Sequence, residues 1–284
     1  MSLFTPLPRI SVWQRCLLAS LLPWAGALNA HLAPREVAFI DSGVTDWQVL
    51  AEGVKPGVEV VLLDGRGDGL AQMADWARGR FGYSAIHVLS HGSPGTVRLG
   101  AFGLNRETLG ERAGELAAIG AALNEGGDLL LYGCNVAAGP TGADFVQRLA
   151  RVTGADVAAS EDLTGSAATG GDWHLEYVSG TFIPTAVMSE SALIAYRHSL
   201  ATYTVTNTGD SGAGTLRNAA SSAASGDIIQ FASSINGSTI TLGTPITLAA
   251  NITLDASLLT TLTITGSTIN LAGNLTVSNN ASAA

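Results

Sequence analysis

The chain has 284 residues, 46% hydrophobic and 13% charged, which is enough for one large or two modest domains with a buried core. Its net charge is −9 with a single lysine, Lys55, which argues against nucleic acid or an anionic membrane as the main partner. The two cysteines exclude a disulfide framework beyond the N-terminal segment, because Cys16 lies in that segment. Cys134 is therefore either an inert core thiol or a reactive one.

Residues 1–30 resemble an export leader. Basic residues precede an apolar run from Cys16 to Ala30, which ends on a candidate cleavage site. Pro23 and the short length of the run argue against a membrane-spanning helix. The alternative is a disordered or amphipathic leader. We expect an exported protein that acts outside the cell or on the cell surface and does not span the membrane.

From residue 36 to about residue 200, strand-like and helix-like segments alternate. Short apolar or β-rich runs bounded by turn residues predict strands, and longer segments with helical apolar spacing predict helices. This alternation predicts an α/β domain with a mainly parallel sheet and helices on both faces. The predicted strands are Val37–Asp41, Val58–Asp64, Ala85–Ser90, Val97–Leu99, Asp128–Tyr132, Ala155–Ala159 and a half-exposed Trp173–Val178, and the predicted helices are Gly69–Arg80, Arg106–Leu123 and Gly142–Val152.

Residues 201–284 have a different composition. Charge almost vanishes, and short apolar runs recur between Gly, Asn and Ser residues. This pattern predicts a solenoid of short stacked strands, and low-complexity disorder is the alternative. Because the pattern stops without a closing element, we expect either a longer protein or a cap formed by association. The predicted strands are Ile228–Phe231, Thr239–Leu242, Ile246–Leu248, Ile252–Leu254, Leu262–Ile264, Ile269–Leu271 and Leu275–Val277.

A histidine and a cysteine follow two of the predicted strands of the α/β segment. His91 comes directly after Ala85–Ser90, and Cys134 comes one glycine after Asp128–Tyr132. Functional groups gather outside the carboxyl ends of parallel strands, which lie about 5 Å apart. This placement suits a cysteine nucleophile and its base. The alternatives are a turn histidine bonded to the backbone and a buried, inert cysteine.

The residues around this pair refine the hypothesis. The turn from Gly92 to Gly95 carries little side-chain bulk, and the amide of Gly92 is free to donate a hydrogen bond. His87, four residues before His91, is interpreted as a core histidine. A nucleophile elbow of the α/β-hydrolase type is disfavoured because Tyr132 and Val136, two residues either side of Cys134, are bulky.

Several carboxylates also end or follow predicted strands. Asp41, Asp64 and Asp68 would be hard-cation ligands if they shared one edge of the sheet. We favour the alternative, in which they cap helices and form turns. The sequence contains no Gly-rich phosphate loop, no zinc-ligand spacing and no repeated Asp-rich calcium motif, so we expect no metal and no cofactor.

Five motifs in a fixed order carry a family resemblance over residues 36–200. The motifs are Val37–Asp41, Ile86–Gly95, Leu129–Gly139, Ala158–Asp162 and Gly171–Glu176. With these motifs the chain resembles the domain of unknown function 4347, a module near the N-terminus of large bacterial surface and adhesin-like proteins.

That family is in turn similar to the caspase–gingipain group of cysteine peptidases, in which a His-Gly follows one strand and a Cys follows a later hydrophobic strand. The resemblance implies a caspase-like fold, His91 as the catalytic histidine and Cys134 as the nucleophile. It also implies that the backbone amides of Gly92 and Cys134 form the oxyanion hole. Glu161 and Asp162, after the strand beyond Cys134, are candidates to line a pocket for a basic residue.

The segment Thr204–Asp255 resembles the opening of a right-handed β-helix of bacterial surface proteins. The resemblance is carried by the run from Thr208 to Ala219 and by Gly226–Phe231. It implies a short capping helix and the first rungs of a parallel β-helix. We therefore expect a leader in residues 1–30, a caspase-like α/β domain in 36–200 and the start of a β-helix in 201–284.

The predicted function is peptide-bond hydrolysis by a Cys134/His91 dyad, on a peptide or protein substrate that includes the protein's own chain as a candidate. A cell-surface partner bound through the β-helix is also a candidate. The competing hypothesis is a catalytically inactive structural or export module of an adhesin. A metal-dependent enzyme built on Asp41 and Asp64 ranks last.

Overall fold

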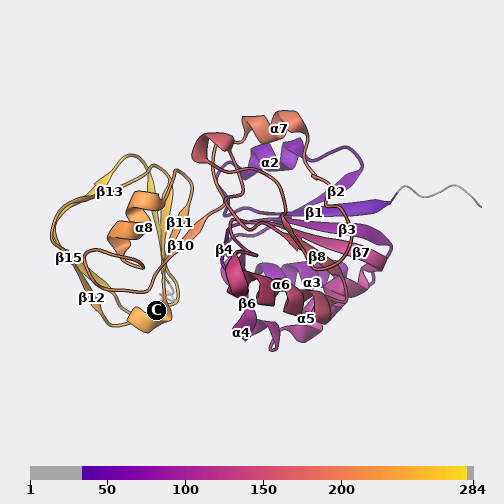
Figure 1. The fold of residues 1–284 in the computed structure, drawn as a ribbon, viewed down its shortest axis with the longest axis horizontal. Coiled ribbons are helices and arrows are strands. Elements are labelled where there is room, and N and C mark those ends of the chain that lie inside the picture. The colour runs from indigo at the N-terminus through magenta and orange to yellow at the C-terminus, as the bar shows by residue number, and fades with distance from the viewer. Residues whose placement is uncertain (1–33, 280–284) are drawn as a thin grey trace, which may run out of the picture. The chain divides into compact units, whose positions relative to one another are not determined.

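The computed structural model describes residues 34–279, and its largest sheet has six strands. These are β1 (Arg35–Asp41), β2 (Val58–Leu63), β3 (Tyr83–Leu89), β7 (Leu123–Tyr132), β8 (Asp156–Ala159) and β9 (Tyr177–Val178). They lie in the order β2-β1-β3-β7-β8-β9, and only β9 runs antiparallel to its neighbour (Figure 1). The predicted α/β architecture with a mainly parallel sheet is confirmed.

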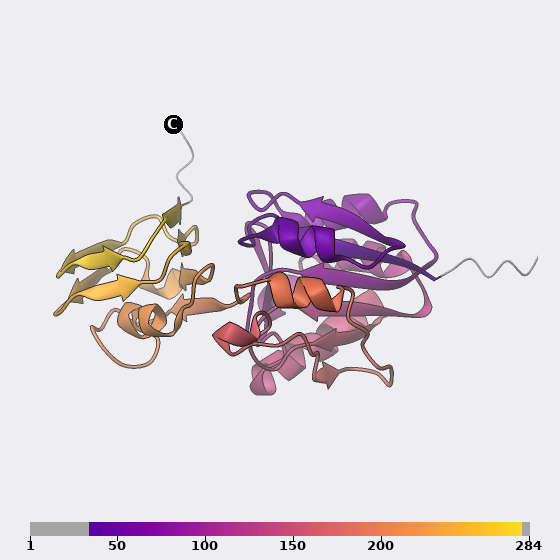
Figure 2. The ribbon, with the colours of Figure 1, turned by 90° about the horizontal axis from the view of Figure 1, so that it is seen from above.

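Helices cover both faces of this sheet, as Figures 1 and 2 show. One face carries α3 (Gly69–Ala77), α4 (Arg106–Leu109), α5 (Ala113–Ala121) and α6 (Gly139–Thr153), and the other carries α2 (Trp47–Gly53) and α7 (Glu190–Ala195). Alternate residues of β1 enter two different cores: Val37 and Phe39 pack with the larger set of helices, and Ala38 and Ile40 pack with the smaller set. Burial on both faces explains the almost continuous apolar sequence of the strands.

The predicted helix Arg106–Leu123 is wrong as a single element. The chain forms α4 and α5 with a break between them, and Leu123 already begins β7. Asn105 caps α4 with its side chain, and Arg112 leaves the helical conformation before α5 starts. A Cβ at Gly120 would lie 1.9 Å from the Thr153 carbonyl oxygen, so α5 approaches α6 more closely than a longer side chain permits.

Two other predicted elements are shorter than expected. The helix Gly69–Arg80 ends at Ala77, ahead of Gly79, whose φ of +70° is left-handed. Of the predicted strand Trp173–Val178, only the last two residues pair with β8. The Asp172 side chain accepts a hydrogen bond from the His174 amide, which forms a turn in place of the start of that strand.

A small antiparallel sheet follows His91 directly. It consists of β4 (Gly92–Ser93), β5 (Thr96–Leu99) and β6 (Phe102–Asn105). Arg98 in β5 donates its amide to the His91 carbonyl oxygen at 2.9 Å, which holds the hairpin over the carboxyl end of β3.

Residues 201–279 form short parallel strands that stack on one another. The elements are β10 (Thr202–Val205), α8 (Leu216–Ser222), β11 (Ile228–Phe231), β12 (Thr239–Leu242), β13 (Ile246–Leu248), β14 (Ile252–Ala256), β15 (Thr263–Gly266), β16 (Ile269–Leu271) and β17 (Leu275–Asn279). Strands pair in the orders β10-β11-β14-β17, β12-β15 and β13-β16, all parallel. Thr239 pairs with Thr263 and Ile246 with Ile269. Each of these strands therefore lies beside the strand that follows it about two dozen residues later in the chain. A separate apolar cluster fills this stacked-strand region.

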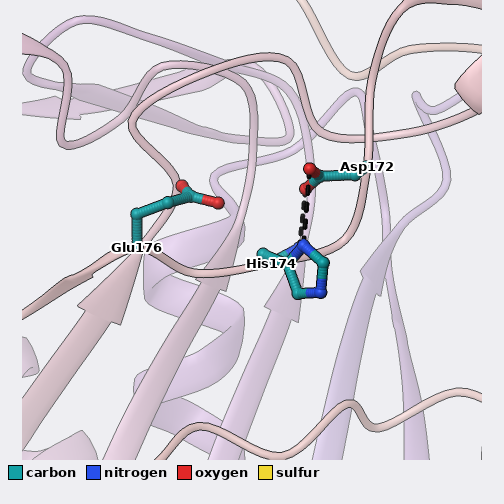
Figure 3. A group of neighbouring side chains, drawn as sticks. All are labelled: Asp172, His174 and Glu176. Atoms are coloured by element: carbon teal, nitrogen blue, oxygen red, sulfur yellow. Dashed lines mark hydrogen bonds and ion pairs between the residues drawn. The ribbon is translucent and has the colours of Figure 1, made fainter.

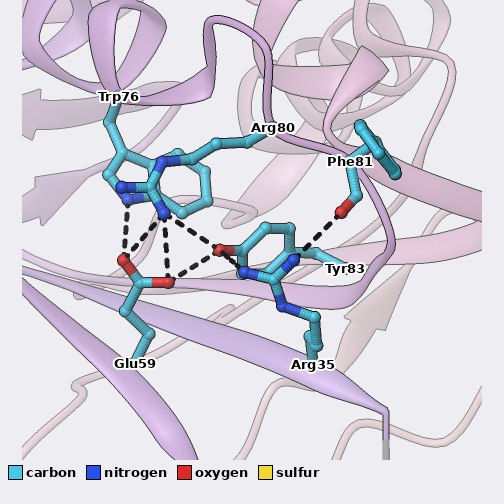
Figure 4. A network of polar contacts seen from close by, with 6 residues as sticks. All are labelled: Arg35, Glu59, Trp76, Arg80, Phe81 and Tyr83. Carbon is cyan, nitrogen blue, oxygen red and sulfur yellow. Dashed lines mark hydrogen bonds and ion pairs between the residues drawn. The ribbon is translucent and has the colours of Figure 1, made fainter. Parts of the chain in front are cut away.

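A polar network closes the amino ends of the main strands (Figure 4). Glu59 of β2 accepts hydrogen bonds from the Tyr83 hydroxyl at 2.6 Å, the Trp76 indole at 3.1 Å and the Arg80 guanidinium at 3.1 Å. Arg35 of β1 donates to the same Tyr83 hydroxyl at 2.7 Å. The network ties the first residues of three strands to α3, at the opposite end of the sheet from His91 and Cys134.

No helix within residues 34–279 is long and apolar enough to cross a membrane. The predicted leader, residues 1–30, lies outside the described residues.

Candidate active site

The structure brings His91 and Cys134 to the same edge of the main sheet. His91 lies two residues after the end of β3, and Cys134 lies two residues after the end of β7. These strands are neighbours: Leu89 pairs with Tyr132, and the Ser90 amide donates to the Tyr132 carbonyl oxygen at 3.1 Å. The two loops therefore leave the sheet side by side, as the sequence predicted for the ends of adjacent parallel strands.

Glycines allow the two loops to touch. A Cβ at Gly92 would lie 2.8 Å from the Cys134 carbonyl oxygen and 2.6 Å from a methyl group of Val136. A Cβ at Gly133 would lie 3.0 Å from the Ser90 carbonyl oxygen. Any side chain at these positions would push the loops apart, so the glycine before Cys134 and the glycine after His91 set the spacing of the site.

The amides of Gly92 and Cys134 converge on one oxygen atom. Both donate to the carbonyl oxygen of Leu200, the Gly92 amide at 2.9 Å and the Cys134 amide at 3.4 Å. These are the two amides that the family resemblance implied for an oxyanion hole. Two backbone donors aimed at one carbonyl oxygen beside a thiol are the arrangement that stabilises a developing oxyanion.

The Cys134 side chain is fully buried and contacts the backbone of Thr164 on both sides. Its thiol donates to the Thr164 carbonyl oxygen at 3.3 Å and accepts from the Thr164 amide at 3.2 Å. Burial raises the pKa of the thiol to about 12, an effect that the Thr164 hydrogen bond offsets in part. In this arrangement Cys134 is a neutral thiol at physiological pH.

The His91 ring is also buried, and neither of its nitrogens meets the geometry of a hydrogen bond to a described residue. Burial, followed by the positive charge of Arg98, lowers the pKa of His91 to about 3. The nearby backbone of Ala201 and Leu200 acts in the opposite direction and offsets part of this shift. Most buried polar atoms have a partner, so this neutral imidazole is an exception that invites a functional explanation.

A small cavity adjoins His91. Its volume is about 20 Å³, and His91, Arg98, Thr202 and Gln230 are among the residues that line it. A cavity of roughly 10–15 Å³ or more holds one water molecule when polar partners are present. The site therefore has room for a single water beside the unpartnered imidazole.

Glu161 and Asp162 lie on the surface next to the loop that follows Cys134. The Asp162 carbonyl oxygen accepts from the Asn135 amide at 2.6 Å, and Asn135 has a left-handed φ of +59°. The Glu161 amide donates to the Glu176 carboxylate at 2.8 Å. Partial burial, followed by the nearby carboxylates of Glu176 and Asp172, raises the pKa of Asp162. Their proposed contact with a basic substrate side chain stays a prediction.

His87 lies inside β3, away from the two converging amides. Its ring is buried and contacts the Glu36 carboxylate at 3.1 Å through Nε2. The hydrogen bond to His87 is the main cause that lowers the pKa of Glu36. This pair is consistent with the core role expected for His87.

The three carboxylates considered as cation ligands bind protein donors instead. Asp41 is buried and accepts from the Gly43 amide at 2.8 Å, the Ser90 hydroxyl at 3.0 Å and the Gly100 amide at 2.7 Å. Asp64 accepts from the amide of Arg66, two residues on, and Asp68 caps α3. These contacts agree with the favoured interpretation as caps and turn formers.

One further group of potential metal ligands was not predicted. Asp172, His174 and Glu176 place their ligand atoms within 4.8 Å of one another at the surface (Figure 3). Asp172 already accepts from the His174 amide at 2.8 Å, and Glu176 accepts from the Glu161 amide. These hydrogen bonds account for the position of both carboxylates without an ion.

Three residues that sequence reasoning missed complete the site: Thr164, Leu200 and Asp227. Asp227 is buried, and its carboxylate accepts from the Ser199 hydroxyl at 2.6 Å and from the Ala201 amide at 3.3 Å. It thus binds the side chain of the residue before Leu200 and the backbone of the residue after it. The only available signal was the position of residues 199–201 at the change of composition, with no motif to mark them.

Residues 37–200 match the family described as a domain of unknown function, DUF4347. The match covers more than half of the chain, and the protein belongs to this family. The boundary of the match falls on Leu200, the residue whose carbonyl oxygen the two site amides bind. A comparison with curated proteins finds no match to the chain.

Proposed function

We propose that this protein is a cysteine peptidase of caspase-like fold, followed by the first turns of a β-helix and exported as part of a bacterial surface protein. The observation that carries the proposal is the convergence of the Gly92 and Cys134 amides on one carbonyl oxygen beside the Cys134 thiol. An inert buried cysteine does not require two backbone donors that share an acceptor next to it.

In the proposed reaction, each group of the site has a separate role. Cys134 is the nucleophile, and His91 accepts the thiol proton and later delivers it to the leaving amine. The amides of Gly92 and Cys134 stabilise the oxyanion, and removal of one such donor typically costs about 3 kcal/mol of transition-state stabilisation. The Cys134 amide is 3.4 Å from the ground-state oxygen, so this bond strengthens as negative charge develops.

The β-helix part of the proposal rests on the stacked-strand region. Parallel pairing between residues about two dozen positions apart, with an apolar cluster inside, is the arrangement of a parallel solenoid. The short helix α8 precedes β11 and covers part of the cluster, consistent with the capping helix that the sequence resemblance implied. A cell-surface partner bound by the β-helix and export by the leader are part of the same proposal.

The burial of Cys134 favours a second candidate, a catalytically inactive module of an adhesin. A thiol with a pKa of about 12 and a histidine with a pKa of about 3 do not form a resting ion pair. Under this alternative, the site is a structural junction between the α/β region and the stacked strands.

A digestion assay separates the two candidates. The purified chain is incubated with unfolded casein, in parallel with Cys134→Ser and His91→Ala. The matched control is His87→Asn, which replaces a buried histidine inside β3. We expect digestion by the wild type and by His87→Asn, and a loss of more than about 100-fold in the other two. Cleavage that persists in Cys134→Ser, or no cleavage of either casein or the protein's own chain, contradicts the peptidase proposal.

A further inference from the structure

The chain residues 198–201 occupy the candidate active site as a bound peptide would. On one side, this segment pairs antiparallel with residues 164–166: the Ser166 amide donates to the His198 carbonyl oxygen at 2.9 Å, and the Leu200 amide donates to the Thr164 carbonyl oxygen at 3.0 Å. Gly165 and Ser199 form an isolated bridge between them. Pairing an extended segment with an exposed backbone edge is a common way to bind a peptide.

The Leu200 backbone bonds both the two donors and the oxygen that accepts from the thiol. Its oxygen accepts from the Gly92 and Cys134 amides, and its amide nitrogen binds Thr164 O, the same oxygen that accepts from the Cys134 thiol. The Cys134 sulfur and the Leu200 backbone are therefore neighbours around one carbonyl oxygen. The Leu200 side chain is buried in the apolar cluster that also contains Cys134, Tyr132 and Tyr196.

The residue after Leu200, Ala201, is also fixed by hydrogen bonds. The Ala201 amide donates to Asp227, and the Ala201 carbonyl oxygen accepts from the Ile228 amide at 3.0 Å. Gly92 and Ala201 also form a parallel bridge. The peptide bond between Leu200 and Ala201 is thus fixed on both sides, with its carbonyl oxygen on the two donors.

The ring of His198 anchors the same segment further upstream. Its Nδ1 lies 3.0 Å from the Ser225 carbonyl oxygen, and its Nε2 lies 2.9 Å from the Asp46 carboxylate. A further contact joins the α/β region to the stacked-strand region outside residues 198–201. Arg98 of β5 forms an ion pair with the buried Asp255 of β14. These contacts immobilise the segment, as a near-attack arrangement requires.

We propose that Cys134 cleaves the protein's own chain at the Leu200–Ala201 bond, within the same molecule, and so separates the α/β region from the stacked-strand region. This inference rests on the proposed peptidase function and identifies its substrate. It also accounts for the buried state of the site, because the substrate segment itself covers the thiol and the imidazole. The Leu side chain that precedes the cut lies in an apolar pocket.

The reaction balances with one water molecule. As the Cys134 thiol passes its proton to His91, the sulfur bonds to the Leu200 carbonyl carbon, and the carbonyl electron pair moves to the oxygen held by the two amides. The oxyanion collapses, the bond to the Ala201 nitrogen breaks, and His91 protonates that nitrogen to give a free amine. Water then attacks the Leu200 thioester, loses a proton to His91 and releases a carboxylic acid, while the proton restores the Cys134 thiol. The cavity beside His91 has room for that water.

The test uses the full chain, purified uncut in urea, refolded and followed by intact mass and N-terminal sequencing. We expect two fragments, the second beginning at Ala201, and no cleavage in Cys134→Ser. Leu200→Met should be cut within about threefold of the wild type, and Leu200→Asp, which places a charge in the apolar pocket, at least 100-fold more slowly. Circular dichroism of each refolded variant confirms that slow cleavage is not a folding failure.

Casein included in the same reactions separates the two proposals. Digestion of casein that requires Cys134, with the Leu200–Ala201 bond intact, overturns the self-cleavage inference and leaves the peptidase proposal standing. Cleavage of neither substrate overturns both. Self-cleavage at another bond, or at Leu200–Ala201 in Cys134→Ser, also overturns the inference.

Discussion

Two buried polar groups at the carboxyl edge of the main sheet, Asp41 and His91, differ in their hydrogen bonding. Asp41, at the end of β1, accepts three hydrogen bonds that tie its neighbouring loops together. His91, after the end of the adjacent strand β3, is equally buried and has no hydrogen-bond partner among the described residues. A buried polar group with all its partners stabilises the fold, and one without them leaves its desolvation cost uncompensated.

The largest expected effect on stability comes from removing Asp41, the member of this pair whose side chain accepts three hydrogen bonds. Asp41→Ala leaves the Gly43 amide, Ser90 hydroxyl and Gly100 amide without their acceptor, and we expect the free energy of unfolding to fall by about 4 kcal/mol. Asp64→Ala, at the exposed carboxylate that directly follows β2, and His91→Gln should each change it by less than about 1 kcal/mol. Urea unfolding monitored by circular dichroism measures the three. A cost at His91 equal to that at Asp41 contradicts the distinction.

The second prediction concerns stability in acid. Because the pKa of His91 falls from 6.5 to about 3 on folding, the unfolded chain binds a proton below pH 6.5 that the folded chain does not bind. His91 therefore contributes a loss of stability of about 1.4 kcal/mol per pH unit as pH falls from 6.5 towards 3. Between pH 6 and pH 4, His91→Gln should lose roughly 2–3 kcal/mol less than the wild type. Equal losses would show that His91 takes up a proton in the folded chain.

The third prediction is the pH dependence of self-cleavage. Between the pKa of His91, about 3, and that of Cys134, about 12, the neutral thiol and neutral imidazole both persist, so the wild-type rate should be flat from pH 5 to pH 9. His91→Ala leaves only the thiolate as nucleophile, and its rate should rise about tenfold per pH unit. Refolding the uncut chain at each pH gives both profiles. A wild-type decline near pH 6.5 would contradict the buried, neutral imidazole.

The smallest expected effect comes from removing one hydrogen bond that positions residues 198–201. Ser199→Ala removes the hydrogen bond to Asp227 at 2.6 Å, and we expect the self-cleavage rate to fall about fivefold, equivalent to about 1 kcal/mol for one such bond. Ser221→Ala, at an exposed position of α8, is the matched control and should leave the rate unchanged. Equal rates in the two variants would mean that the Ser199–Asp227 hydrogen bond does not position the segment.

The strands and their order along the chain were predictable, because apolar runs between turn residues are strong local signals. The predicted limits of Ile228–Phe231, Thr239–Leu242 and Ile246–Leu248 agree with β11, β12 and β13. The break between α4 and α5 was not predicted, because Arg112 leaves the helical conformation inside a segment whose apolar spacing fits a single helix.

Only part of the candidate site was predictable from the sequence. His91 and Cys134 stand at strand ends, and sequence alone is sufficient to place both at one edge of a parallel sheet. The contacts of Thr164, Leu200 and Asp227 with that edge depend on chain segments that meet only in three dimensions, 30 or more residues from Cys134. Sequence reasoning therefore placed the two candidate residues at one edge of the sheet and missed the segment that lies against them.

The most direct test of the central claim is to trap the acyl intermediate between Cys134 and Leu200. The uncut chain is refolded in the presence of hydroxylamine, which attacks a thioester, and the C-terminus of the first fragment is identified by mass spectrometry. The account predicts a hydroxamate on Leu200 in the wild type and uncut chain in Cys134→Ser. A fragment that carries only a carboxylate at every hydroxylamine concentration, or a chain that remains uncut, would contradict it.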